Sequence, residues 1–260
     1  MVHQVKPKGE ALTLQELQEA LTSKTKAVCL PYVHTFSGWR LDIAAMGELC
    51  RAKGIVFIVN MSQAIGAFEV DIASLPVDAV VCAGYKWLLG PYGTGFCWIK
   101  NDVRRKLDYP QAYWISLMDE NTLASTEELT LKEDTSARRY DVFATANFFN
   151  FVPWRASIEY LLDAGMEEVG RHNRDLVDRI VDGLDKQFEL ISPSSRSGRT
   201  NIVVFSHKDR ARNEQVFGYL KEQGLHGALW KGKLRVAPHI YNTAQDIDRL
   251  LSALRNYGRE

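Results

Sequence analysis

The stretch Val77-Asp78-Ala79-Val80-Val81-Cys82-Ala83-Gly84-Tyr85-Lys86-Trp87-Leu88-Leu89-Gly90 decides the fold. An apolar, β-branched run ends here in a bend rich in glycine and aromatic residues, and the bend carries a single lysine, Lys86. No other charged residue lies between Asp78 and Lys100. Burial in such a bend removes water from an amine, lowers its pKa and leaves it able to form a Schiff base. The alternative is a solvated loop lysine, which the aromatic neighbours on both sides disfavour.

Parallel strands covered by helices are predicted for the first part of the chain. Apolar β-branched runs indicate strands over residues 27–32, 55–59 and 79–82. A helical pattern over 41–53 separates the first two strands, which is typical of a parallel sheet buried on both faces. Ligands of open α/β sheets bind beyond the carboxyl ends of the strands. We therefore expect the polar residues and the glycine that follow these runs to converge on one cleft: Gly38, Asn60, Gln63 and Lys86.

A smaller domain is predicted for the second part. The pattern weakens between residues 101 and 140, where we expect a long excursion that covers the site or meets a second subunit. Helical periodicity returns over residues 147–164, 166–187, 213–223 and 243–257. Strand patterns are found over residues 201–206 and 233–236. The predicted fold class is α/β, with a mostly parallel large domain over 1–150 and a small α+β domain over 151–260.

The bulk composition excludes several classes of protein. The 260 residues are 46% hydrophobic and 25% charged, and 32 basic residues balance 32 acidic ones. Nucleic acid is not expected as a partner, because there is no basic excess to neutralise phosphates. No apolar run reaches the ~20 residues of a membrane helix, and the first residues lack the apolar core of a signal peptide. We therefore expect a cytoplasmic protein. We expect no metal site, because no two cysteines form a C-x-x-C pair.

Five segments resemble the motifs of class V pyridoxal-phosphate (PLP) enzymes, a family that includes isopenicillin-N-epimerase-like proteins, cysteine desulfurases, kynureninase and small-molecule aminotransferases. Besides the lysine bend, these segments are residues 26–38, 58–66, 143–147 and 234–243, in family order. The resemblance implies the PLP-transferase type I fold, PLP as cofactor, a small amino-acid substrate and a homodimer. The family's opening segment, with its phosphate-cradling turn and ring-stacking aromatic residue, has no counterpart. We therefore expect the large domain to be incomplete at its N-terminus.

The resemblance assigns roles around the cofactor ring. Lys86 is implied as the Schiff-base lysine and, once freed by substrate, as the base at the substrate Cα. Asn60 stands where the family has the aspartate that faces the pyridine nitrogen, and Gln63 matches the glutamine that binds the phenolic oxygen. A carboxylate keeps that nitrogen protonated, whereas an amide can only hydrogen-bond it. Thr35 lies in the matching glycine turn. Asn60 could instead merely end a strand, and Gln63 could be a surface residue at a helix start.

The resemblance also implies phosphate and substrate contacts. Ala83 stands where many relatives have serine, and Tyr85 is expected to compensate for the lost hydroxyl. Thr145 and Asn147 match the motif that reaches the phosphate of the neighbouring subunit, although a helix N-cap would account for them equally well. Arg235 is expected to bind the substrate carboxylate with its two-pronged guanidinium, the alternative being a surface salt bridge.

These observations predict a PLP-dependent class V aminotransferase-like enzyme acting on a small amino acid through Lys86. Transamination, epimerisation and elimination all remain open. The alternative is a truncated or degenerate, catalytically silent relative that keeps the fold and dimer interface, as Asn60, Ala83 and the absent segment would suggest. A cysteine desulfurase is disfavoured, because the family's desulfurases carry their reactive cysteine on a late loop and no cysteine follows Cys97 here.

Overall fold

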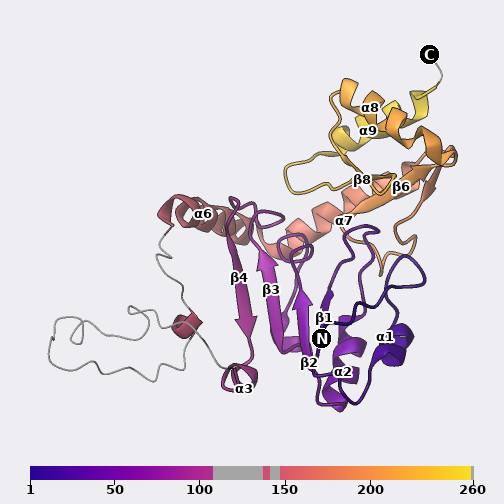
Figure 1. The fold of residues 1–260 in the computed structure, drawn as a ribbon. Coiled ribbons are helices and arrows are strands. Elements are labelled where there is room, and N and C mark those ends of the chain that lie inside the picture. Colours follow the sequence, from indigo (N-terminus) through magenta and orange to yellow (C-terminus); the bar gives the residue numbers. More distant parts are fainter. Residues whose placement is uncertain (108–136, 141–146, 259–260) are drawn as a thin grey trace.

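A four-stranded sheet forms the centre of the large domain (Figure 1). The computed structural model describes residues 1–107, 137–140 and 147–258. The sheet order is β1-β2-β3-β4, in which the first three strands are parallel and the last is antiparallel. The strands are β1 (Ala27–Pro31), β2 (Val56–Asn60), β3 (Ala79–Ala83) and β4 (Gly95–Ile99). The carboxyl ends of β2 and β3 therefore lie at the same edge of the sheet.

Two helices cover the early strands because their apolar residues face the sheet. Helix α1 (Leu14–Ala20) begins with a capping box between Thr13 and Glu16, as the sequence indicates. Helix α2 (Ile43–Ala52) is capped by Asp42 and buries its apolar side against the core. Strand β2 and helix α2 both supply fully buried members of this core, such as Phe57, Val59 and Met46. One helical turn, η1 (Ile72–Ser74), connects β2 to β3.

The second domain is built on an antiparallel sheet of order β5-β6-β8-β7. Its elements are β5 (Phe188–Leu190), β6 (Val203–His207), η3 (Arg210–Arg212), α8 (Asn213–Glu222), β7 (Ala228–Trp230), β8 (Lys233–Val236) and α9 (Ala244–Asn256). Both α8 and α9 pack their apolar residues against β6 in a separate core, so this domain has its own hydrophobic centre.

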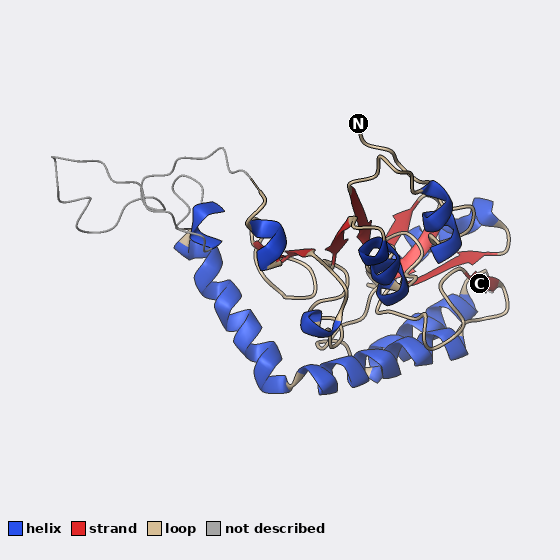
Figure 2. Cartoon of the chain, turned by 90° about the horizontal axis from the view of Figure 1, so that it is seen from below, coloured by secondary structure: helices blue, strands red, loops and turns tan. Residues whose placement is uncertain are grey.

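A pair of helices joins the two sheets. Helix α6 (Phe148–Ala164) runs beside the first sheet, and α7 (Met166–Gly183) continues to the second (Figure 2). They meet at an angle at Gly165, whose φ of 79° favours glycine. Short α3 (Asn101–Arg104) and η2 (Ala137–Tyr140) lie between β4 and α6 in the chain.

The two domains dock through the turn that follows β1. Ser192 donates its hydroxyl to the carbonyl of Ser37 (2.7 Å), and Thr200 donates to the carbonyl of Gly38 (2.8 Å). A Cβ on Gly38 would lie 2.2 Å from the carbonyl oxygen of Ile202, so only glycine fits. Gly38, which the sequence predicts at the cleft, thus serves the docking of the domains.

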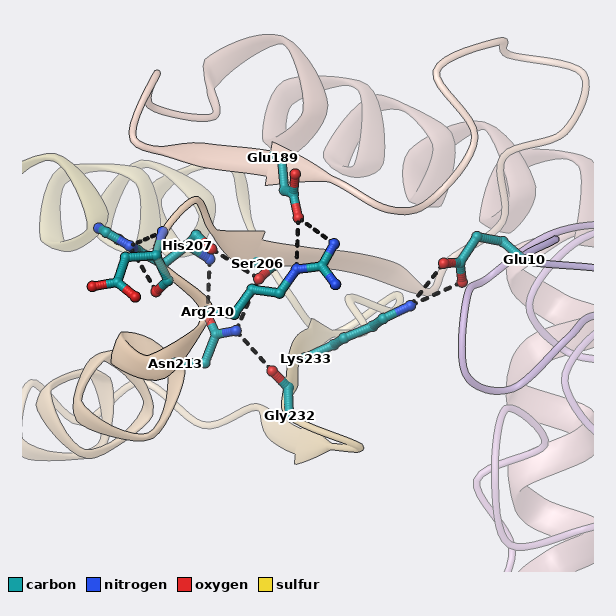
Figure 3. A network of polar contacts seen from close by, with 9 residues as sticks. Glu10, Glu189, Ser206, His207, Arg210, Asn213, Gly232 and Lys233 are labelled. Carbon is teal, nitrogen blue, oxygen red and sulfur yellow. Dashed lines mark hydrogen bonds and ion pairs between the residues drawn. The ribbon is translucent and has the colours of Figure 1, made fainter.

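A salt bridge adds a second link between the domains. Lys233 of β8 reaches Glu10 at 2.8 Å, as Figure 3 shows. In the same view, Asn213 holds the hairpin between β7 and β8 through the carbonyl of Gly232 (2.7 Å). These contacts fix β8 relative to the large domain, and β8 carries Arg235.

The predicted elements are present, with small differences in their bounds. Helix α7 ends at Gly183 instead of reaching residue 187, because Leu184 adopts extended backbone. The sequence analysis did not identify β5 and β7, which have three residues each and too little pattern to recognise. The mostly parallel sheet and the small α+β domain agree with the predicted fold class. The division at residue 150 stays a prediction, and α6 runs through it.

Candidate functional site

The bend that carries Lys86 closes on itself through backbone hydrogen bonds. The N–H of Gly84 donates to Thr94 (2.9 Å), and the N–H of Gly90 donates back to the carbonyl of Gly84 (2.8 Å). A Cβ on Gly84 would lie 2.3 Å from the Thr94 hydroxyl, so glycine is needed for this closure. The bend is therefore a fixed platform for the lysine.

The back of the bend is packed against both domains. His239 of the small domain donates from Nε2 to the carbonyl of Trp87 (2.9 Å), and its ring stands edge-on to the Trp87 indole at 5.2 Å. Its Nδ1 accepts from Asn173 (3.2 Å), and burial lowers the pKa of His239, which keeps the ring neutral. On the other side, a Cβ on Gly66 would lie 2.5 Å from the carbonyl oxygen of Trp87. These contacts leave no room for the bend to shift.

The electrostatic environment of Lys86 favours a neutral amine. Loss of solvent is the main cause that lowers the pKa of Lys86, and the positive charge of Arg235 lowers it further. Cys82 acts in the opposite direction, but burial raises the pKa of its own thiol to about 11. Among the described residues, no carboxylate contributes to the pKa of Lys86. The amine is thus shifted towards its nucleophilic form.

Asn60 lies at the carboxyl end of β2, one strand away from the lysine. Its side-chain oxygen Oδ1 accepts the backbone N–H of Ser62 at 3.0 Å. The Ser62 hydroxyl in turn accepts the backbone N–H of Ala83 at 2.8 Å, at the end of β3. The ends of β2 and β3 are thereby tied together. The Asn60 side chain itself is solvent-exposed, as a residue that meets a ligand must be.

Gln63 connects the two strand ends with the turn after β1. Its Oε1 accepts the indole N–H of Trp87 at 3.0 Å, and its Nε2 donates to the Thr35 hydroxyl over a longer 3.4 Å. The Gln63 side chain is buried, so its amide would be costly to leave unpaired. The structure thus brings Gln63, Thr35 and the lysine bend into direct contact.

Arg235 enters the site from the central strand β8 of the small domain. Burial lowers the pKa of Arg235, and its guanidinium carbon lies 4.9 Å from the centre of the Trp230 ring. Its Nε is buried and has no hydrogen-bond partner within the described residues. Nor does Arg235 form an ion pair within the described part of the chain. A half-buried guanidinium whose buried Nε has no hydrogen-bond partner among the described residues fits an anionic ligand.

Tyr85 and Asn147 are the remaining predicted residues that the structure describes. Tyr85 stacks on Tyr92 with 4.7 Å between ring centroids, and Lys86 Nζ lies 5.9 Å from the Tyr85 ring. Asn147 is the N-cap of α6, where its side chain accepts the N–H of Asn150 at 3.2 Å. The contact expected of Asn147, to the phosphate of a neighbouring subunit, stays a prediction. Thr145 lies outside the described residues.

Three residues that shape the site were not assigned a role from the sequence. Ser62 orients Asn60, Trp87 orients Gln63, and His239 supports the bend from the small domain. Trp87 and Ser62 are sequence neighbours of Lys86 and Gln63, and this proximity was the signal that could have identified them. The role of His239 depends on a contact across 152 positions of the chain.

An apolar groove of about 440 Å³ lies beside the site, between the first sheet and helix α6. No charged residue lines it; its walls include Phe68, Phe96, Trp154, Leu161 and Leu162. Nearby apolar side chains are exposed, and we call this surface the α6–β4 face: Phe96, Trp98, Phe148, Phe149 and Val152. The groove lacks the polar groups that an amino acid or a phosphate would require.

The described residues contain neither a cluster of metal-binding side chains nor a helix that could span a membrane. No three or more metal-binding side chains gather where they could hold an ion in the described part of the chain. None of the described helices combines the length and the apolar character needed to span a bilayer.

Comparison with known proteins places the chain in a family. Residues 2–250 match the class V aminotransferase family. A probable cysteine desulfurase of Pyrococcus abyssi is 24% identical over 242 residues, which are 88% of this chain and 59% of the relative. An uncharacterised aminotransferase of Bacillus subtilis is 24% identical over 237 residues, which are 91% of this chain and 60% of the relative.

Solved structures show the same fold. The apo cysteine desulfurase of Thermococcus onnurineus has a TM-score of 0.84 at 19% identity, covering 99% of this chain and 66% of that one. A cystine C-S lyase in complex with cysteine persulfide has a TM-score of 0.82 at 21% identity, covering 93% and 64%. A mutant of C-DES in which glycine is linked to the PLP cofactor has a TM-score of 0.83.

The chain shares its fold with this PLP-linked protein, and it belongs to the class V aminotransferase family. The resemblance stated from the motifs is thereby confirmed, as are the type I fold and PLP as the cofactor of this class. The chain spans about 60% of the length of the curated relatives it matches. Their activities therefore do not transfer directly to this chain.

Proposed function

We propose that this chain provides the lysine side of a PLP-dependent aminotransferase-like site that acts on a small amino acid. The observation that carries this proposal is the buried Nε of Arg235, which has no hydrogen-bond partner in the described part of the chain and whose positive charge lowers the pKa of Lys86. A nucleophilic amine beside a carboxylate-binding guanidinium is the arrangement that an α-amino acid requires. The donors present also fit PLP, whose phosphate, phenolic oxygen and ring nitrogen all accept hydrogen bonds.

Lys86 is proposed to hold the cofactor covalently and afterwards to move the proton at the substrate Cα. Bound PLP supplies the electron-withdrawing ring that makes this proton removable. The lowered pKa of Lys86 leaves more of the amine unprotonated at neutral pH, which serves both roles. The closed bend holds Nζ in place, so little reorganisation is needed when substrate arrives.

Arg235 is proposed to orient the substrate through its carboxylate. Its position over the Trp230 ring keeps the guanidinium plane fixed. Gln63 and Asn60 are proposed to contact the phenolic oxygen and the ring nitrogen, and Tyr85 to contact the phosphate. Thr35 supports Gln63 through its hydroxyl.

A homodimer is proposed as the assembly, with Thr145 and Asn147 contributing to the partner's phosphate site. The α6–β4 face supports association, because large apolar side chains exposed together commonly mark an interface. Helix α6 carries apolar residues on more than one side, since Trp154 and Leu161 are buried while Phe149 and Leu162 are exposed.

The catalytically silent relative is the second candidate. Asn60 in place of a carboxylate and Ala83 in place of a hydroxyl favour it, since both changes weaken expected cofactor contacts. A cysteine desulfurase is disfavoured although several relatives bear that name, because no cysteine follows Cys97 and burial raises the pKa of both Cys82 and Cys97.

Borohydride reduction of the PLP-loaded protein, followed by peptide mass spectrometry, tests the proposed function. We expect one reduced adduct, on Lys86, and its loss in Lys86→Ala. Lys53→Ala, at the exposed end of α2, is the matched control and should keep the adduct. An adduct on another lysine, or none at all in the wild-type protein, would contradict the proposal.

A further inference from the structure

Two amide side chains at the site have their oxygen atoms already occupied. The Oδ1 of Asn60 accepts the backbone N–H of Ser62, and the Oε1 of Gln63 accepts the indole N–H of Trp87, both at 3.0 Å. Both donors are N–H groups that can only donate, so they face oxygen and not nitrogen. The orientation of each amide is thereby determined by its partner.

The consequence is that each amide has its NH2 group on the side away from the donor that its oxygen accepts. The Nε2 of Gln63 makes one long contact, 3.4 Å to Thr35, and retains a second hydrogen for another acceptor. Asn60 is exposed, so its Nδ2 is open to a ligand or to water. Lys86 and Arg235 add two further donor groups, and no carboxylate acts on Lys86 within the described residues.

We infer that Asn60 turns its NH2 group towards the ring nitrogen of bound PLP and so holds that nitrogen unprotonated. This inference rests on the proposed function, which assigns Asn60 to that nitrogen. A nitrogen that receives a hydrogen bond from an NH2 group must use its lone pair and so carries no proton. The ring then withdraws fewer electrons than a protonated one.

The occupied oxygen distinguishes Asn60 from an amide that is free to turn. A rotated Asn60 would present Oδ1 to the ligand and could accept from a protonated ring nitrogen. Rotation would also place NH2 against the N–H of Ser62, so two donors would meet and one hydrogen bond would be lost, at about 1 kcal/mol or more. An aspartate at this position accepts from Ser62 with one oxygen and offers the other to the ring.

Nuclear magnetic resonance tests the orientation in the protein without cofactor. We expect a scalar coupling across the hydrogen bond between the amide nitrogen of Ser62 and the side-chain carbonyl carbon of Asn60. A matching coupling is expected between the Trp87 indole nitrogen and the Gln63 side-chain carbonyl. Absence of the Ser62 coupling in the folded protein overturns the inference, whether or not the protein binds PLP.

The nitrogen-15 shift of ring-labelled PLP tests the consequence in the loaded protein. The resonance should lie in the unprotonated range throughout neutral pH, and move to the protonated range in Asn60→Asp. Asn256→Asp, on exposed α9, gives the same charge change away from the site and should leave it unmoved. A protonated nitrogen in a wild-type protein whose adduct maps to Lys86 overturns this inference and leaves the proposed function standing. Failure to load PLP overturns the proposed function, and with it the assignment of Asn60 to the ring.

Discussion

The lysine bend and the α6–β4 face lie beside the same sheet, yet the bend is paired and buried whereas the face is exposed. In the bend, backbone groups pair with one another, and Trp87 is buried between the two domains. On the α6–β4 face, Phe149 is 94% exposed, and β4 pairs with β3 alone among the described strands. The difference shows that the described residues complete the lysine platform but leave the neighbouring apolar surface uncovered.

The difference has a physical origin in where the partners of each region come from. The bend receives its partners from β2, β4 and the small domain, all of which belong to this chain. Helix α6 packs with Trp154 and Leu161 on one side and leaves its other apolar residues in solvent. Such residues lower the free energy only when another surface covers them. Four predictions test this contrast.

Gly66→Ala should produce the largest effect, because it disturbs the packed side of the contrast. A Cβ at this position lies 2.5 Å from the Trp87 carbonyl oxygen, and the φ of 90° is unfavourable for alanine. Strain and overpacking together should lower the free energy of unfolding by about 3 kcal/mol. Urea denaturation followed by far-ultraviolet circular dichroism measures the loss.

Gly54→Ala is the matched control for that experiment. Gly54 also has a positive φ, 64°, but a Cβ there meets nothing within 4 Å. Only the backbone strain of about 1–2 kcal/mol should appear. Equal losses in the two variants would mean that the close approach to the lysine bend does not matter.

Phe149→Ser tests the exposed side of the contrast. If the α6–β4 face is covered by association, removing one buried aromatic ring should weaken it by about 1.5 kcal/mol or more, roughly tenfold in the dissociation constant. Sedimentation velocity over a range of concentrations measures this change. Arg155→Ser, on the same helix, removes only an exposed ion pair with Glu159 and should change little. A wild-type protein that stays monomeric at every concentration would contradict the expectation.

Trp87→Phe separates the hydrogen bond from the packing within the bend. Phenylalanine keeps an aromatic ring but leaves the buried Gln63 Oε1 without its donor. The free energy of unfolding should fall by about 1–3 kcal/mol. We expect a value near the lower end of this range, because Gln63 can turn towards Thr35 and regain a hydrogen bond. Trp98→Phe, in exposed β4, serves as the comparison and should lie within ~0.5 kcal/mol of wild type. A similar loss in the free energy of unfolding for both variants would contradict the expected difference between the bend and the α6–β4 face.

Lys86→Met should give the smallest effect, and its sign depends on pH. The folded-state pKa of Lys86 is lowered, so the folded protein binds fewer protons than the unfolded chain between the two pKa values, and stability rises with pH there. Below both pKa values the destabilisation by the charged amine is fully present, and it is lost as the pH rises through them. Methionine should therefore raise the free energy of unfolding slightly, and the gain should shrink at alkaline pH. Denaturation at neutral and alkaline pH checks this, with Lys53→Met as the exposed control; a pH-independent difference would be inconsistent with the lowered pKa.

Much of the site could be predicted, because it follows the order of elements in the chain. Asn60 and Lys86 come directly after strands, and parallel strands bring such positions to one edge. The contacts that orient these residues could not be predicted from the sequence to the same extent. His239 is placed beside Trp87 only when the small domain docks, and the three-residue β7 beside Arg235 has too short a pattern to be recognised.

The sequence by itself determined the family, the order of strands and helices, and the presence of one lysine in an apolar bend. These follow from local periodicity, from glycine and proline positions and from motif order, which need no knowledge of the distant chain. Only the tertiary structure decided which way the amides of Asn60 and Gln63 point, and that the buried Nε of Arg235 has no hydrogen-bond partner among the described residues. An amide has nearly the same shape in both orientations, so its direction is set by the donors that folding brings against it.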